Sequence, residues 1–242
     1  WVLVAGRVPV TDEGRNAFQY LFLVPRSDFV VEDTWHATGL KGTGTNVVVI
    51  NDAFVPEYRA SSEADTAMLR LDPESGNSGP LYRHPWGLIL SYAIAAPAIG
   101  MALAAHDHYV AFVKARRDGD ARGDPHAHLL IARNRTILDC VLAKLQQNLE
   151  ELARVTASGA APSMDLRAQC RWEASWMTES CATVTRVVFE AMGASAIGDD
   201  HPVQRLFRDI HVLKAHRINN TESTGENFGR LQVGLTNREA FL

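Results

Sequence analysis

Three long stretches of helical periodicity constrain the possible folds of this chain more than any other feature of its sequence. They cover about Pro85–Arg116, Pro125–Ser158 and Met164–Met192. In the second stretch, apolar residues recur along one face and most charged residues lie off that face. A shorter fourth pattern begins at Pro202, which lacks the N–H that has no partner in the first turn of a helix, and Asn219, Asn220 and Gly225 end the pattern. The connections between the stretches are short, which predicts an antiparallel four-helix bundle.

The residues before the helical stretches have a different character. Short runs rich in Val, Leu, Phe and Tyr predict strands at Val2–Val10, Phe18–Val24, Phe29–Thr34 and Asn46–Ile50, with a short extension at Ala53–Val55. Between Glu57 and Arg83 the periodicity is lost and Ser, Asp, Pro and Gly are common, which predicts a linker. The predicted fold class is therefore α+β, with part of a β domain at 1–60, a linker at 61–83 and a four-helix bundle at 84–242.

Composition excludes some classes of protein. Hydrophobic residues make up 46% of the 242, enough for a sizeable core, and the net charge of −4 comes without a basic face for a nucleic acid. Cys140, Cys170 and Cys181 lie far apart, so we expect buried, reduced thiols and a cytoplasmic protein. The uncharged run Trp86–Ala105 is diluted by small and polar residues, which favours a buried bundle helix over a membrane span. The chain starts at Trp1 without a signal sequence, and we expect a piece of a longer polypeptide.

Two motifs that could bind a small group carry little specificity. Gly39–Asn46 has three glycines in six residues, which lets the backbone turn or approach another group closely. No strand–turn–helix unit of a Rossmann site surrounds it. The pairs His106/His108 and His126/His128 are each two residues apart. On a helix such side chains point away from each other, so we expect no metal site.

The order of these segments resembles the acyl-CoA dehydrogenase fold, in which a middle β domain precedes a C-terminal four-helix bundle that forms tetramers. Two blocks carry the resemblance: Gly39–Gly44 with Val47–Ile50, Asn51-Asp52 and Phe54-Val55-Pro56, and Gly193–Ile197 with Pro202–Arg205 and Arg208-Asp209. By this resemblance the chain is the C-terminal two-thirds of its protein. The N-terminal helical domain and the first strands of the β domain would precede it.

Within this superfamily, position 217 separates two chemistries. One dehydrogenase branch places its catalytic Glu nine residues after the Arg of the Arg-Asp pair, where this chain has Arg217, a permanent cation. His216 precedes it, which resembles the oxygenase components of two-component flavin-dependent monooxygenases, whose closing segment presents a histidine to the reactive edge of the flavin. The resemblance implies that His216 is catalytic, because an imidazole can hold or pass a proton near neutral pH. Without the resemblance, His216 is also explained as a cation at a helix C-terminus.

The resemblance implies further contacts with the flavin. Gly193-Ala194-Ser195 would bring backbone N–H groups to the flavin ring or phosphate across a subunit boundary, and a helix-ending glycine turn is the alternative interpretation. Arg116 would pair with a phosphate, although Arg117 is next to it and either could be a solvated helix end. Arg217 would lie beside His216 at the cofactor. Arg83 and Trp86 would line the substrate pocket, with a cation for an acidic group and a ring to stack on an aromatic substrate.

The function implied by the resemblance is a flavin-dependent monooxygenase. It would receive reduced FMN or FAD from a separate reductase and use O2 to hydroxylate a small, aromatic substrate through a C4a-hydroperoxyflavin, as a homotetramer with no nucleic-acid or membrane partner. One alternative is an acyl-CoA dehydrogenase-type flavoenzyme whose base is Glu173 or Glu190. A second alternative is a non-catalytic fragment that only assembles through the bundle. We expect the chain by itself to bind flavin poorly.

Overall fold

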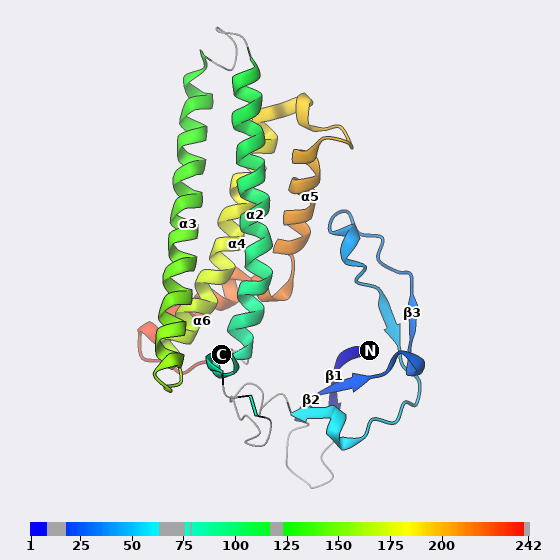
Figure 1. Cartoon of the computed structure of the whole chain (residues 1–242). Coiled ribbons are helices and arrows are strands. Elements are labelled where there is room, and N and C mark those ends of the chain that lie inside the picture. The colour runs from blue at the N-terminus through cyan, green and yellow to red at the C-terminus, as the bar shows by residue number, and fades with distance from the viewer. Residues whose placement is uncertain (9–17, 63–75, 78, 117–122, 240–242) are drawn as a thin grey trace.

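The computed structural model describes residues 1–8, 18–62, 76, 77, 79–116 and 123–239, in a small β region and a bundle of helices (Figure 1). An antiparallel sheet has the order β1 (Val2–Val8), β2 (Phe18–Val24), β5 (Ala60–Ser62), and a second antiparallel pair is β3 (Val30–Glu32) with β4 (Val47–Val49). The helices are α2 (Trp86–Ala115), α3 (Pro125–Ala157), α4 (Met164–Met192), α5 (Pro202–Lys214) and α6 (Thr221–Gln232). The predicted α+β fold class is confirmed.

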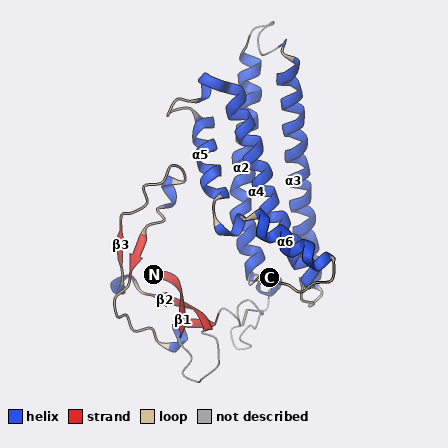
Figure 2. Cartoon of the chain, turned by 180° about the vertical axis from the view of Figure 1, so that it is seen from behind, coloured by secondary structure: helices blue, strands red, loops and turns tan. Residues whose placement is uncertain are grey.

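Helix α4 lies at the centre of the bundle and packs against α2, α3, α5 and α6 (Figure 2). The core of the bundle includes fully buried side chains from four helices: Leu88 of α2, Leu138 of α3, Met177 of α4 and Ile210 of α5. Burial of each such side chain contributes roughly 1.5–3 kcal/mol. The bundle is therefore held by the apolar faces that the periodicity predicts.

Helix α2 is long and apolar enough to cross a membrane, judged by length and composition. Its buried face, which includes Leu88, Tyr92 and Ile99, belongs to the core cluster that it shares with α3, α4 and α5. This packing supports the expectation that the uncharged run is a helix of the bundle.

Helix α6 was not predicted, because Asn219, Asn220 and Gly225 were expected to end the helical pattern. Asn220 instead caps α6, and its side-chain Oδ1 accepts a hydrogen bond from Ser223 N. Asparagine is favoured both in turns and at helix N-termini, so its presence does not distinguish an end from a beginning. Gly225 lies against Trp172 of α4, and a Cβ at position 225 would be 2.9 Å from the Cζ3 atom of that ring. This glycine serves close helix packing and does not mark a turn.

The predicted extension at Ala53–Val55 was wrong. Phe54 is 82% exposed and follows Asp52, which has a φ of 49°, so this segment turns away from the sheet. The last strand is β5, which lies where the linker was expected to start and reaches Ser62. Most of the remaining predicted linker (63–75 and 78) is outside the described residues.

The expectation for the cysteines was correct for two of the three. Cys170 and Cys181 are buried in α4, and burial raises the pKa of Cys170 to about 11 and that of Cys181 to about 12. Cys140 is exposed on α3, where it follows the exposed Asp139 on the face of the helix that points away from the core. Burial in the bundle therefore keeps the two α4 thiols protonated.

The glycine turn docks the β region on α5. Leu40 N donates a hydrogen bond to Asp209 Oδ1 at 2.6 Å, and Arg208 Nη1 donates to Thr38 O at 2.9 Å. A Cβ at Gly39 would lie 2.5 Å from the backbone oxygen of Arg208, so only glycine fits there. Backbone approach, one of the two roles expected for these glycines, is confirmed at Gly39.

Replacing Gly39 by Ala should therefore weaken the docking. We expect G39A to destabilise the β region by about 1–3 kcal/mol, the usual range for overpacking. Gly42 provides the matched control, because a Cβ there would meet nothing within 4 Å. Limited proteolysis and urea unfolding of both variants test this prediction, and equal stability of G39A and G42A would contradict it.

Two partly or fully buried histidines make stability depend on pH. His106 of α2 is 4% exposed, and desolvation lowers its pKa below the usual 6.5, with smaller effects of Asp107 and Asp139 upward and of Arg135 downward. Desolvation also lowers the pKa of His84. Below about pH 6.5 the unfolded chain therefore binds more protons at these sites than the folded chain, and stability falls as the pH falls.

We expect the double variant H84Q/H106Q to lose less stability than the unaltered chain between about pH 7 and pH 5. Both histidines bind a proton more readily in the unfolded chain than in the folded one, and glutamine does not titrate. Urea unfolding at a series of pH values measures this slope. The exposed His126 gives the control variant H126Q, which should keep the original slope. The same slope in all three proteins would contradict the assignment.

Candidate functional site

His216 lies where α5 gives way to the short 3-10 turn Arg217–Asn219. Its N–H donates to Leu213 O at 3.1 Å, and its carbonyl accepts from Asn219 N at 2.8 Å. The ring Nδ1 accepts from Ile218 N at 3.2 Å. Because an accepting Nδ1 carries no proton, the neutral ring has its proton on Nε2. The ring therefore caps the following turn with one nitrogen and keeps Nε2–H as a donor.

The exposed ring of His216 opens into a polar depression of about 570 Å³. Other residues that line it come from α4, from the end of α5, from the turn and from the start of α6: Glu179, Lys214, Ala215, Arg217, Asn219, Asn220, Thr221 and Glu222. Lys214 Nζ and Glu179 Oε2 form an ion pair at 2.7 Å in its wall. The volume falls within the range of about 300–1,000 Å³ that is usual for ligand sites.

Arg217 lines the same depression, and its side chain is exposed. A guanidinium stays charged at any physiological pH and cannot accept a proton from a substrate. It can instead hold an anionic group. The depression thus combines one proton-carrying ring, His216, with two cationic side chains, Lys214 and Arg217.

The other residues expected at the flavin lie at one end of the bundle, away from His216. Gly193-Ala194-Ser195 follows α4 and is exposed, with Gly193 at a φ of 54°. Arg116 ends α2, and its guanidinium lies 4.9 Å from the ring centre of Phe112. The ends of α2 and α4 share a core cluster that contains Val113 and Met192. From this end α5 runs 13 residues toward His216, about 20 Å at 1.5 Å per residue. Within one chain, these residues and His216 are not brought together.

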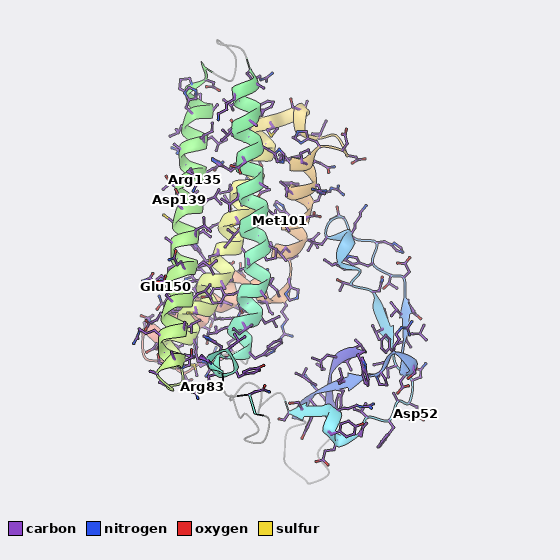
Figure 3. The ribbon with its side chains drawn as sticks, in the orientation of Figure 1. Asp52, Arg83, Met101, Arg135, Asp139 and Glu150 are labelled. Carbon is purple, nitrogen blue, oxygen red and sulfur yellow. The ribbon has the colours of Figure 1, made fainter. Side chains whose placement is uncertain are left out.

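Arg83 and Trp86 lie in a third place. Arg83 lies beside the end of α3, with Nη1 3.5 Å from the position that a Cβ of Gly159 would occupy, at the lower end of the bundle in Figure 3. Trp86 begins α2 and is 42% exposed. Helices α3 and α5 flank α2 on opposite sides, so Arg83 lies on the α3 side and His216 on the α5 side (Figures 1 and 2). Arg117, the alternative to Arg116, is outside the described residues.

The two carboxylates considered as dehydrogenase bases have other partners. Glu173 forms an ion pair with Lys144 at 2.9 Å and accepts hydrogen bonds from Asn148 and Gln169. Glu190 pairs with Arg186 one turn away on the exposed surface of α4. Both side chains are engaged within the bundle, and neither lines the depression at His216.

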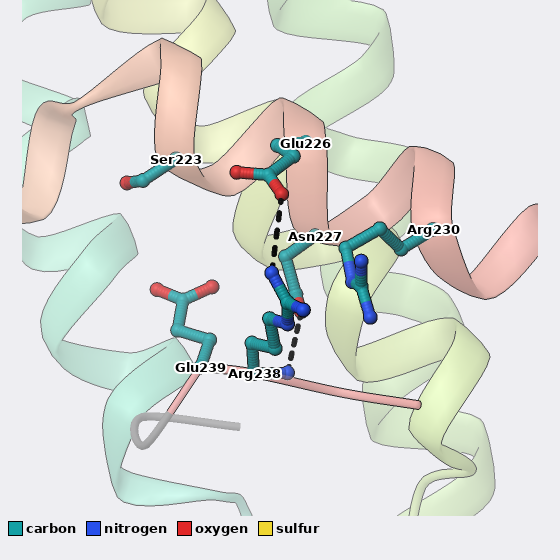
Figure 4. A pocket seen from close by; sticks show the side chains of 6 residues that line it. All are labelled: Ser223, Glu226, Asn227, Arg230, Arg238 and Glu239. Atoms are coloured by element: carbon teal, nitrogen blue, oxygen red, sulfur yellow. Dashed lines mark hydrogen bonds and ion pairs between the residues drawn. The ribbon is translucent and has the colours of Figure 1, made fainter. Parts of the chain in front are cut away.

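A smaller pocket of about 150 Å³ forms where the chain after α6 returns along that helix (Figure 4). Glu226 faces Arg238 across it at 3.8 Å, and Asn227 Oδ1 accepts from Arg238 N at 2.8 Å. This volume is below the usual range for organic ligands. Among the described residues, no three His, Cys, Asp or Glu side chains gather as metal ligands would.

Several residues of the depression were not identified from the sequence. Glu179 lies on α4, 37 positions before His216, and no motif connects them. Asn219 and Asn220 were interpreted, with Gly225, as the end of a helical pattern. The N-terminal capping pattern of a further helix, with Asn at its first position, was the one signal that could have revealed them.

Comparisons with known proteins agree with this architecture. Residues 92–221 match the family model of the acyl-CoA dehydrogenase C-terminal domain. The oxygenase subunit HsaA of a flavin-dependent monooxygenase from Mycobacterium tuberculosis is 34% identical over 97% of this chain and 60% of its own length. The oxygenase component of the FADH2-dependent resorcinol hydroxylase from Rhizobium sp. is 27% identical over 97% of this chain and 60% of its own length.

Solved structures give the same result. The crystal structure of 3-HSA hydroxylase from Rhodococcus sp. RHA1 superimposes with a TM-score of 0.91 and 31% identity, covering 99% of this chain and 62% of that protein. The chain thus spans about 60% of the length of these relatives. Because the family model covers more than half of the chain and the fold agrees, this chain belongs to the acyl-CoA dehydrogenase C-terminal domain family, and its homologues there are oxygenase components of flavin-dependent monooxygenases.

Proposed function

We propose that this chain is the C-terminal part of the oxygenase component of a two-component flavin-dependent monooxygenase that hydroxylates a small aromatic substrate. The observation that carries the proposal is the His216 ring, which has Nδ1 bound to Ile218 N and Nε2 available in an open depression. The residue after it, Arg217, stands at the position where one dehydrogenase branch has its catalytic carboxylate, and a guanidinium cannot serve as that base. Relatives named as hydroxylases support an aromatic substrate.

The residues present fit a flavin. Homologues use FADH2 or FMN. The depression offers the guanidinium of Arg217 for an anionic group of the cofactor, while Lys214 pairs with Glu179 in its wall. Bound reduced flavin supplies two electrons to O2, so that one oxygen atom enters the substrate and the other leaves as water. A separate flavin reductase would deliver the cofactor, and the protein would work in the cytoplasm.

The chain's own residues control protons in this proposal. His216 Nε2–H would donate a hydrogen bond to the reacting group, and the ring would act there as a general acid and base. The ion pair between Lys214 and Glu179 fixes the wall beside the ring. Glu179 accepts a hydrogen bond from Lys214 Nζ, and this bond holds the Glu179 side chain in the wall.

The two groups of expected flavin residues support assembly. Arg116 and Gly193-Ala194-Ser195 are separated from His216 by about 20 Å along α5. The two groups would therefore belong to two incomplete flavin sites, each completed by another subunit. In the proposed homotetramer, the Gly193 turn of one subunit would meet the His216 depression of another. Arg83, beside the end of α3, and Trp86, at the start of α2, remain the proposed substrate contacts and would act at a site completed by another part of the assembly.

The function is tested with the complete oxygenase polypeptide that contains this chain. It is mixed with reduced FAD, isotopically labelled O2 and either resorcinol or p-hydroxyphenylacetate as the phenolic probe, and the products are measured by mass spectrometry. We expect one labelled oxygen atom in a hydroxylated product. Release of hydrogen peroxide with no labelled product from any phenol, together with oxidation of an acyl-CoA by an artificial electron acceptor, would favour the dehydrogenase alternative.

A further inference from the structure

We propose that Asn219 is the positioning residue that sets the orientation of the His216 ring, an inference that rests on the proposed function. Asn219 is 4% exposed, and both ends of its amide are bonded. Its Nδ2 donates to Leu213 O in the last turn of α5 at 2.8 Å, and its Oδ1 lies 3.4 Å from Thr178 Oγ1 of α4, whose one proton is shared with Ala174 O at 3.3 Å. Thr178 is fully buried, so this second contact anchors the turn to the centre of the bundle.

The same residue holds the backbone of His216 on both sides. Leu213 O, which accepts from the Asn219 amide, also accepts from His216 N at 3.1 Å. Asn219 N donates to His216 O at 2.8 Å. A carbonyl at a helix C-terminus has no partner within the helix, and here Asn219 supplies one. Of these bonds, the one from Asn219 Nδ2 to Leu213 O comes from a side chain, and it ties the far end of the turn back to the last turn of α5.

Ring orientation follows from this backbone. His216 Nδ1 accepts from Ile218 N, and Ile218, which is 8% exposed, lies between His216 and Asn219. Displacing Asn219 moves Ile218 N away from the ring. The ring then loses the bond that keeps its proton on Nε2 and gains rotational freedom. A misplacement of about 1 Å can reduce catalysis about 100-fold, so Asn219 would control the reaction through the position of the His216 ring.

Asn148 provides the matched control. It is equally buried at 3% exposure and donates to Tyr92 Oη at 3.0 Å and to Glu173 Oε2 at 2.7 Å. Its partners lie on α2 and α4 outside the depression. An effect of burial alone would therefore appear in N148A as well as in N219A.

The test measures the ¹⁵N signals of the His216 ring in the 242-residue chain, assigned by their disappearance in H216N. The unaltered chain and N148A should show the well-separated signals of a single Nε2–H tautomer. N219A should show signals that converge toward the average of the two tautomers, and in the complete oxygenase it should lower labelled product per reduced flavin about tenfold or more. Well-separated signals retained in folded N219A would overturn the proposal.

A second variant with nearly the same side-chain shape keeps the test decisive if N219A does not fold. N219D keeps the outline of the side chain but cannot donate to Leu213 O, and circular dichroism selects the folded variant for comparison. If N219A does not fold, converged signals in N219D support the role and unchanged signals overturn it. Failure of the proposed function looks different, because the unaltered oxygenase would then form no labelled product while the ring signals of N219A still converge.

Discussion

Replacing His216 by Asn should lower the hydroxylation rate of the complete oxygenase about 100-fold or more while leaving its folding nearly unchanged. Asn is among the best N-cap residues, so its side-chain oxygen can accept from Ile218 N in place of the ring Nδ1. It cannot hold or pass a proton, and general acid–base groups contribute about 10²–10⁴-fold to rates. Labelled product and hydrogen peroxide per reduced flavin measure the effect, and product should fall as peroxide rises.

His201 supplies the control for this prediction. It caps the other end of α5 in the same manner, with Nδ1 accepting from Val203 N at 3.3 Å, and it lies about 20 Å from the depression. H201N should therefore keep the unaltered rate. Equal rates in H216N and the unaltered oxygenase would show that His216 only caps the turn. Equal losses in H201N and H216N would show that stability of α5, and no proton chemistry, is responsible.

The second large effect is expected at the chain's return along α6. Arg171 of α4 is 3% exposed, and its Nε donates to Glu239 Oε1 at 2.7 Å. Burial lowers the pKa of the Arg171 guanidinium, and Glu239 acts in the opposite direction. Removing the carboxylate leaves a buried charge without its counter-ion, which costs about 3–5 kcal/mol. E239A should lose this much in urea unfolding.

Helix α4 carries its own control for that prediction. Arg186 and Glu190 form an ion pair of the same chemistry at 2.8 Å, with side chains 46% and 56% exposed. An exposed pair contributes about 0–1 kcal/mol, so E190A should change little. The double variant R171M/E239L, which replaces both buried charges by apolar side chains, should regain much of the stability lost in E239A. Equal losses in E239A and E190A would contradict the importance of burial.

The sequence predicted the bundle well because helical periodicity records which face of each helix is buried. Three predicted helices agree with α2, α3 and α4 to within about one residue at each end. Polar core residues were not visible in this pattern. Asn148 is buried while its neighbour Leu149 is 45% exposed, since Asn148 joins the hydrogen-bond network of Glu173. A specific polar partner here outweighed hydrophobicity.

Short elements were harder to predict. Strand β5 contains only Ala60, Ser61 and Ser62, whose composition is that of a loop, and it forms because β2 offers an edge to pair with. Pairing between segments far apart in sequence leaves no local signal. The docking of Gly39 on α5 is likewise a contact across 169 positions, although the glycine itself indicated a close approach.

The sequence indicated individual residues of the candidate site. It did not indicate which of them lie close together in three dimensions. Position 216 follows from a resemblance in one segment, and the structure places that ring in a depression. The separation of Arg116 and Gly193 from His216 depends on the direction and length of α5 between them. Asn219 carries no motif, because an asparagine that binds a helix end and a neighbouring helix looks like any turn asparagine.

The central claim is that the His216 ring faces the flavin, and titration of the ¹⁵N-labelled chain with FAD up to millimolar concentration, without oxygen, tests it most directly. Weak binding, which we expect of this chain, still shifts signals in fast exchange. The account predicts that the His216 ring signals move with flavin concentration. Unchanged His216 signals with clear shifts elsewhere in the chain would contradict it.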